Sequence, residues 1–237
     1  MLKIRLACLV TILLFTTIIS EETSTAYRPE NTIIAFDIHG VIANTSKTGV
    51  CKKAVRFQRK RAAFFGIFKP RFLKNMISSL WQHATFHNVL QVCDQYNPAL
   101  SELLIDLSAE QVINQDVADI IKNLKAAGYT LHIVSNIEQR SLQILKRKFP
   151  DVFNAFDAEY IPHNYDARAK IIRKPNPEFF NDYFAQCVPA GYNVIFIDDS
   201  ARNIASFKSC SGMQAHKFVN AEKLQSELTN HSILTEN

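Results

Sequence analysis

The sequence predicts an α/β protein in which helices cover both faces of a parallel sheet. From residue 114 onward, short apolar runs alternate regularly with longer segments of helical periodicity. Strands that alternate with helices pair in parallel, because each connection crosses over the sheet. In addition, residues 33–36 form an uninterrupted apolar run, which is typical of a strand buried on both faces.

The predicted elements have recognisable starts and stops. Asn114 is a suitable N-cap for a helix that Gly128 closes, and Pro150 is expected to stop a helix over 138–149. Asn176, followed by a proline at the first helical position, begins a helix that extends to about residue 187. Strands are expected at 129–134, 158–161, 193–197 and 214–219, and helices at 98–107, 201–209 and after Asn220.

Residues 44–111 interrupt this alternation and read as a mostly helical, basic insertion. The core would then comprise 21–43 and 112–237. From Lys52 to Lys74 there are nine Lys or Arg residues and no acid, with Phe residues interleaved. This stretch fits a solvated helix face, a surface that attracts an anionic substrate, or a contact with a polyanion such as nucleic acid or with a membrane surface.

Residues 1–20 resemble a signal peptide. Lys3 and Arg5 precede an uncharged, mostly apolar run, and two acids follow Ser20. We therefore expect an exported protein, periplasmic or secreted, with an uncleaved membrane anchor as the alternative. Four cysteines remain after residue 20, and they form either disulfides or buried free thiols. No His/Cys cluster has zinc-like spacing, so zinc is not expected; the four cysteines are Cys51, Cys93, Cys187 and Cys210.

Polar residues follow three of the predicted strands at the point where each strand ends. Asp37 follows the first, Ser135 and Asn136 follow the second, and Asp198 and Asp199 follow the third. The carboxyl ends of parallel strands share one edge of the sheet, where open α/β proteins place their binding sites. We therefore expect these side chains to lie together.

Their chemistry suits phosphoryl transfer through a carboxylate. Asp37 would be the nucleophile that forms an aspartyl phosphate. Carboxylates gathered this closely repel one another unless a hard cation lies among them, and oxygen ligands suit Mg²⁺. Lys174, flanked by Pro175, and the Ser135 hydroxyl would hold the phosphate oxygens.

Four motifs, in order, make the chain resemble the haloacid dehalogenase (HAD) superfamily. They are F-D-I-H-G-V-I, H-I-V-S-N, R-K-P-N-P-E-F-F and V-I-F-I-D-D-S-A-R-N-I. The resemblance covers about 31–44 and 111–219, and it implies a Rossmann-like core with an inserted α-helical cap. It also implies a hydrolase with a metal-binding site.

The resemblance assigns a role to each matching residue. It implies a nucleophile, a stabilising cation, phosphate-binding groups and Mg²⁺ ligands that include the backbone carbonyl of residue 39. Asp37 matches the nucleophile and Lys174 the stabilising cation. Ser135 and Asn136 match the phosphate-binding groups. The metal ligands would be Asp37, His39, Asp198 and Asp199.

His39 is the departure from the family pattern, because phosphatases of this family usually carry a second Asp there. Imidazole titrates near pH 6.5 and can both donate and accept protons, so His39 is a catalytic candidate. The neighbouring carboxylates are expected to keep it protonated. The predicted function is Mg²⁺-dependent hydrolysis of a phosphomonoester. The alternative is a catalytically weakened HAD fold that binds an anionic partner through the basic insertion.

Overall fold

The computed structural model describes residues 27–46, 48–49, 90, 93–95, 98–108, 110–162 and 172–234. The predicted signal peptide, the basic stretch from Lys52 to Lys74 and Cys51 lie outside the described residues. Among the described residues, no helix is long and apolar enough to cross a membrane.

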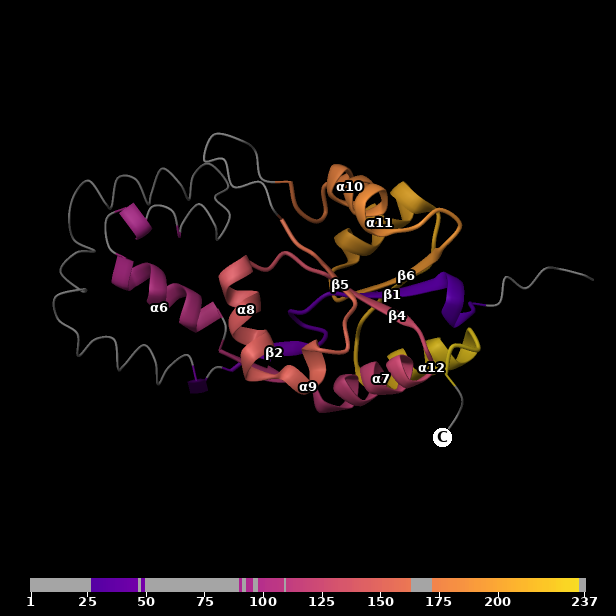
Figure 1. Cartoon of the computed structure of the whole chain (residues 1–237), viewed down its shortest axis with the longest axis horizontal. Coiled ribbons are helices and arrows are strands. Elements are labelled where there is room, and N and C mark those ends of the chain that lie inside the picture. Colours follow the sequence, from indigo (N-terminus) through magenta and orange to yellow (C-terminus); the bar gives the residue numbers. More distant parts are fainter. Residues whose placement is uncertain are drawn as a thin grey trace, which may run out of the picture.

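A five-stranded parallel sheet forms the centre of the fold, in the order β5-β4-β1-β6-β7 (Figure 1). This confirms the predicted α/β class. The central strand β1 is buried along its whole length, and it pairs with β4 on one side and β6 on the other. The strands are β1 (Thr32–Phe36), β4 (Thr130–Val134), β5 (Ala158–Tyr160), β6 (Asn193–Asp198) and β7 (Ala215–Lys217).

Helices cover both faces of this sheet, as the alternation predicts. Because side chains alternate along a strand, Ile34 and Phe36 of β1 enter one core cluster, whereas Ile33 and Ala35 enter the other. The first cluster is closed by α7 (Gln115–Ala126), α8 (Gln139–Lys148), α9 (Pro150–Phe153) and α12 (Ala221–Asn230). The second is closed by α10 (Pro177–Cys187) and α11 (Ala201–Ser211).

The core under α10 and α11 is rich in aromatic side chains. Phe180 packs edge-to-face on Phe196 and Phe207, and these two rings stack with their centres 4.9 Å apart. On β4, the buried His132 shares a 3.0 Å hydrogen bond with the hydroxyl of Tyr183. Burial lowers the pKa of His132, so this imidazole is a neutral core group.

Two short strands differ from the helical insertion predicted for 44–111. β2 (Ala43–Thr45) and β3 (Gln111–Ile113) pair antiparallel where the chain leaves the core and returns to it. Each is only three residues long, which is too short for a strand periodicity to be recognised. The predicted helix at 98–107 is present as α6 (Pro98–Ser108).

The described part of the insertion is tied to α8, beside which α6 lies in Figure 1. Arg140 on α8 forms a 3.3 Å ion pair with Asp94, and Lys148 forms a 3.2 Å ion pair with Glu110. These contacts join the insertion to the helix that directly follows one of the site strands.

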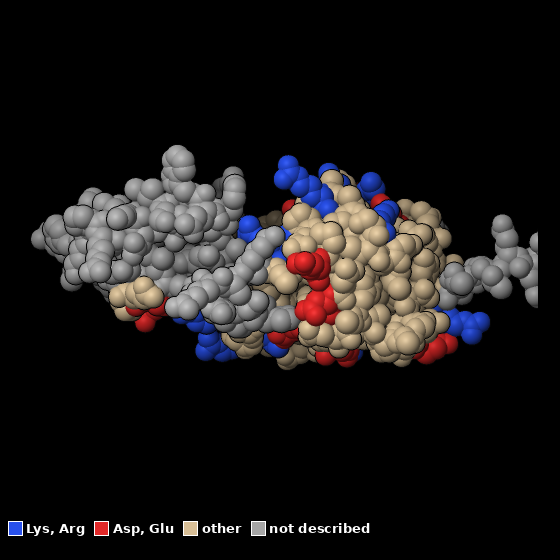
Figure 2. All heavy atoms as spheres, turned by 90° about the horizontal axis from the view of Figure 1, so that it is seen from above, with Lys and Arg blue, Asp and Glu red and all other residues tan. Residues whose placement is uncertain are grey.

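Pro150 does not simply stop a helix, because it also occupies the first position of the short helix α9. A proline fits there because the N–H that it lacks would have no partner inside the helix. Cys93, Cys187 and Cys210 are free thiols in the structure. The face seen in Figure 2 carries both basic and acidic side chains on a mostly uncharged surface.

Candidate active site

The ends of β1, β4 and β6 bring the predicted site residues to one edge of the sheet. Asp37 follows β1, Ser135 follows β4, and Asp198 is the last residue of β6. These three strands are neighbours in the sheet (Figure 1). The Asp37 N–H continues the strand pairing by donating to the carbonyl of Ile197 at 2.9 Å.

Three carboxylates meet at this edge. One oxygen each from Asp37, Asp198 and Asp199 lies within 4.8 Å of the other two; Asp37 and Asp198 are buried and Asp199 is exposed. Burial raises the pKa of both Asp198 and Asp199, and the charge of Asp37 adds to this effect. The arrangement favours a cation among the three oxygens.

Gly40 lies directly against this cluster. A Cβ at this position would be 2.3 Å from Oδ2 of Asp199, and its φ of +80° is one that other residues rarely adopt. Glycine therefore allows the turn after β1 to approach the acidic pair at the end of β6.

Lys174 is buried between two of the carboxylates. Its Nζ donates to Asp37 Oδ1 at 2.9 Å, to Asp198 Oδ2 at 2.7 Å and to the Val134 carbonyl at 2.7 Å. All three ammonium hydrogens therefore have an acceptor. The Phe196 ring, with its centre 5.2 Å from Nζ, adds a cation–π contact.

Asp198 is held by more donors than Lys174 alone. The N–H of Ser200 donates to its Oδ1 at 2.8 Å, and the side-chain amide of Asn203 lies 2.9 and 3.0 Å from its two oxygens. Sequence reasoning missed Asn203, although its position in the first turn of the helix after the acidic pair was a usable signal. Asp198 is thus saturated by internal donors, whereas Asp199 remains exposed.

Ser135 and Asn136, both predicted to bind phosphate, differ in their surroundings. The Ser135 Oγ is fully buried and has no hydrogen-bond partner among the described residues. A buried hydroxyl without a partner is costly, and an oxygen-rich ligand at this edge would supply one. The Asn136 amide instead bonds the backbone of Lys174 in both directions, at 2.9 Å each.

His39 is half-buried in the turn after Asp37, and its backbone bridges to Ala43. Burial lowers the pKa of His39, and the charge of Lys174 acts in the same direction. Asp37 and Asp199 raise that pKa, but they do not outweigh the burial. The expectation that neighbouring carboxylates keep His39 protonated is therefore wrong, because desolvation is the larger effect.

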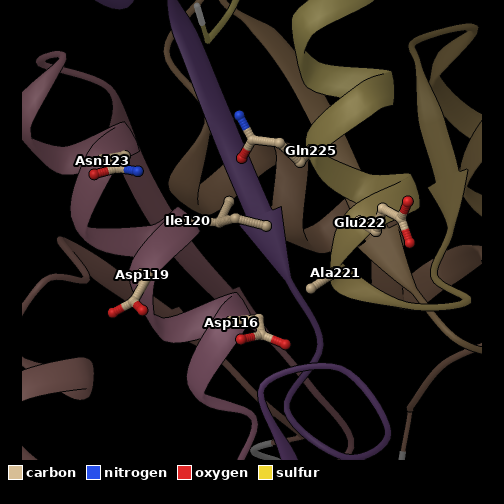
Figure 3. Close-up of a pocket in the computed structure, with 7 residues that line it drawn as sticks. All are labelled: Asp116, Asp119, Ile120, Asn123, Ala221, Glu222 and Gln225. Carbon is tan, nitrogen blue, oxygen red and sulfur yellow. The ribbon is translucent and has the colours of Figure 1, made fainter. Parts of the chain in front are cut away.

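A concave region lies between α7 and α12 (Figure 3). It is lined by acids on the first turns of the two helices, Asp116 and Glu222, and by Asp119. Acids in a first turn complement the helix dipole, and Asp119 lies 3.5 Å from Lys122. These charges are explained by the helices themselves.

Fold and site together define an α/β protein with a carboxylate directly after its central strand. Residues 32–210 match the family model of the haloacid dehalogenase-like hydrolases. The chain belongs to this family, and the resemblance found in the four motifs is confirmed. No curated protein sequence matches the chain.

Solved structures of HAD proteins share the fold. The chain is 16% identical to L-2-haloacid dehalogenase from Xanthobacter autotrophicus, solved with chloropropionic acid covalently bound, with a TM-score of 0.52 over 85% of this chain and 84% of that one. It is 15% identical to the putative HAD-hydrolase YfnB from Bacillus subtilis, solved with magnesium, with a TM-score of 0.55 over 84% and 99%. A predicted HAD-like hydrolase from Porphyromonas gingivalis is 19% identical, with a TM-score of 0.55 over 87% and 99%.

Proposed function

We propose that the protein is a Mg²⁺-dependent phosphohydrolase that acts on a phosphomonoester through an aspartyl phosphate. The observation that carries this proposal is the group of three carboxylate oxygens within 4.8 Å. A dehalogenase attacks carbon with a single carboxylate and has no need of an acidic pair. A phosphatase does need one, because the pair binds the cation that offsets the repulsion between its carboxylates and a dianionic phosphate ester.

The residues present fit a magnesium ion. Asp37 and Asp199, with the backbone carbonyl of His39, would hold it. Asp198, which is also a predicted ligand, accepts hydrogen bonds from Lys174, Ser200 and Asn203 on its two oxygens, so it would support the site through Lys174. Oxygen-only ligands of this kind suit a hard divalent cation. When bound, Mg²⁺ would neutralise phosphate charge during transfer. Among the solved relatives, the magnesium-bound HAD-hydrolase from Bacillus subtilis agrees with this cofactor.

The chain's own residues account for two half-reactions. In the first, a carboxylate oxygen of Asp37 forms a bond to phosphorus while the ester P–O bond breaks. The leaving alkoxide takes a proton from the imidazolium form of His39, which has to take up that proton before the step because burial lowers the pKa of this side chain. In the second, a water oxygen attacks the phosphorus of the aspartyl phosphate and its proton returns to His39. The bond to Asp37 then breaks, which releases phosphate. The Ser135 hydroxyl, which is buried without a hydrogen-bond partner among the described residues, would bind a phosphate oxygen, and the charge of the Lys174 ammonium beside Asp37 would stabilise the transferred group.

Turnover of a general chromogenic phosphate ester tests the proposal. We expect the full chain to hydrolyse the ester when Mg²⁺ is present. Removal of the metal with EDTA should abolish most of this activity, because the carboxylates then repel the substrate. Absence of turnover under any divalent cation, together with binding of a polyanion, would refute the proposal.

Polyanion binding without turnover would instead indicate an alternative function. The replacement of the usual Asp by His39 and the nine basic residues between Lys52 and Lys74 favour a catalytically weakened HAD fold that binds an anionic partner. The partner would be a polyanion or an anionic membrane surface. Export, or anchoring by residues 1–20, remains part of either proposal.

His39→Asp separates the two functions. If His39 is a working group, we expect this change to lower kcat by about 10- to 100-fold, because it replaces the imidazole with a shorter carboxylate and adds a negative charge beside Asp37 and Asp199. The neutral His39→Gln is the control that removes proton transfer without adding charge. An increase in kcat for His39→Asp would instead show that the natural protein is a weakened phosphatase.

A further inference from the structure

The side chain of Asn136 forms a two-way hydrogen-bonded pair with the backbone of Lys174. Its Nδ2 donates to the Lys174 carbonyl at 2.9 Å, and its Oδ1 accepts from the Lys174 N–H at 2.9 Å. The side-chain amide thus bonds both the N–H and the carbonyl of Lys174, as the backbone of a neighbouring β-strand would do. This pair joins the segment after β4 to the segment before α10, across 38 residues of chain.

The backbone of Lys174 has to be held in place for its long side chain to reach the site. Its side chain has four rotatable bonds, and side chains of this kind lose much conformational freedom when they are ordered. The Nζ must nevertheless reach Asp37, Asp198 and the Val134 carbonyl at once. A shift of the Lys174 backbone would move the ammonium away from all three acceptors.

Asn136 is suited to this task because it lies just after β4, the strand that also supplies one acceptor for the Lys174 ammonium. Lys174 Nζ binds the carbonyl of Val134, two residues before Asn136, while the Asn136 amide binds the Lys174 backbone. The backbone and the ammonium of Lys174 are therefore both hydrogen-bonded to residues at the carboxyl end of β4. The buried Ser135 hydroxyl lies between these two contacts in the chain.

We propose that Asn136 is a positioning residue that sets the Lys174 ammonium between Asp37 and Asp198, rather than a primary phosphate ligand. The inference rests on the proposed phosphatase function for its catalytic consequence, but the positioning itself does not depend on that function. One amide hydrogen of Asn136 is left over after the bond to Lys174. Direct phosphate contact through this hydrogen is the competing role that the test has to separate.

The first test measures the positioning without any catalysis. Acetic anhydride modifies lysines according to their accessibility, and the Lys174 side chain is only 1% exposed. Peptide mass spectrometry gives the rate of Lys174 acetylation in the folded full chain. We expect Asn136→Ala to raise this rate by roughly 10-fold or more, because the loop is released from β4. Asn123→Ala, at an exposed helical position, is the matched control and should leave the rate unchanged.

The second test is a double-mutant cycle on phosphate ester hydrolysis. We expect Asn136→Ala to lower kcat by about 10- to 100-fold with little change in KM, which is the usual cost of a misplaced catalytic group. Lys174→Met should lower kcat by roughly 100- to 1,000-fold. If Asn136 acts through Lys174, the double variant should lie within about threefold of Lys174→Met alone.

Each result has a distinct meaning. An unchanged acetylation rate in Asn136→Ala, or an unchanged kcat in an active enzyme, overturns the proposal. Faster acetylation with a full additional loss in the Lys174→Met background, or with a raised KM, assigns Asn136 to phosphate binding instead. A protein without phosphatase activity but with faster acetylation refutes the proposed function and leaves the positioning intact. Asn136→Ser, which keeps one hydrogen bond, replaces Asn136→Ala if thermal melting shows that the alanine variant does not fold.

Discussion

Replacing Asp37 with Asn is expected to abolish the phosphoenzyme and to lower kcat by roughly 1,000-fold or more, as removal of a nucleophile generally does. The amide has nearly the size of the carboxylate, but its oxygen carries no charge and does not attack phosphorus. The measurement is rapid quenching with a radiolabelled phosphate ester, followed by hydroxylamine treatment, which cleaves acyl phosphates. The natural chain should retain hydroxylamine-sensitive label, and the variant should retain none.

Asp116→Asn is the control for this experiment. Asp116 is an exposed acid on α7 (Figure 3), and the same substitution there should leave labelling and kcat unchanged. Thermal melting of both variants shows whether each is folded. Turnover that survives Asp37→Asn in a folded protein would refute the aspartyl-phosphate mechanism.

Lys174→Met is expected to cost about 3–5 kcal/mol of the free energy of unfolding. Methionine has a similar length, but it leaves Asp37 and Asp198 as two buried carboxylates without their shared cation. Urea denaturation at neutral pH measures the change. Mg²⁺ should recover part of the loss, because a cation that binds only the folded state stabilises it by mass action.

Lys125→Met is the matched control on α7. Lys125 lies 2.6 Å from Asp157, but its side chain is 41% exposed. Exposed ion pairs contribute about 0–1 kcal/mol, because water screens them and already solvates both charges. Equal losses in Lys125→Met and Lys174→Met would contradict the idea that Lys174 balances buried charge.

Much of the candidate site was predictable because it follows from the geometry of parallel strands. Asp37 and Asp198 lie at the ends of apolar runs, and neighbouring parallel strands end at one edge whatever their separation in sequence. Lys174 was predictable from its proline-flanked motif. Its contact with Asp37 nevertheless spans 137 residues, and its three acceptors could not be counted from sequence.

The partners of the two asparagines were not predictable in the same way. Asn136 follows the buried Ser135 and was assigned to phosphate, but its amide is paired with the Lys174 backbone. Asn203 was not assigned to the site, although its amide lies against both oxygens of Asp198. An amide both donates and accepts, so its residue type does not indicate which neighbour it binds.

The sequence by itself determined the α/β class, the order of the core elements, the family and the edge of the sheet where the site lies. The class, the order and the edge follow from periodicity and from the residues at the strand ends, and the family follows from the resemblance of the four motifs to those of known proteins. Only the tertiary structure decided that Asp198 is saturated while Asp199 is exposed, and that burial lowers the pKa of His39 against its acidic neighbours. Desolvation and hydrogen-bond saturation depend on which distant segments pack together, and no local pattern encodes that.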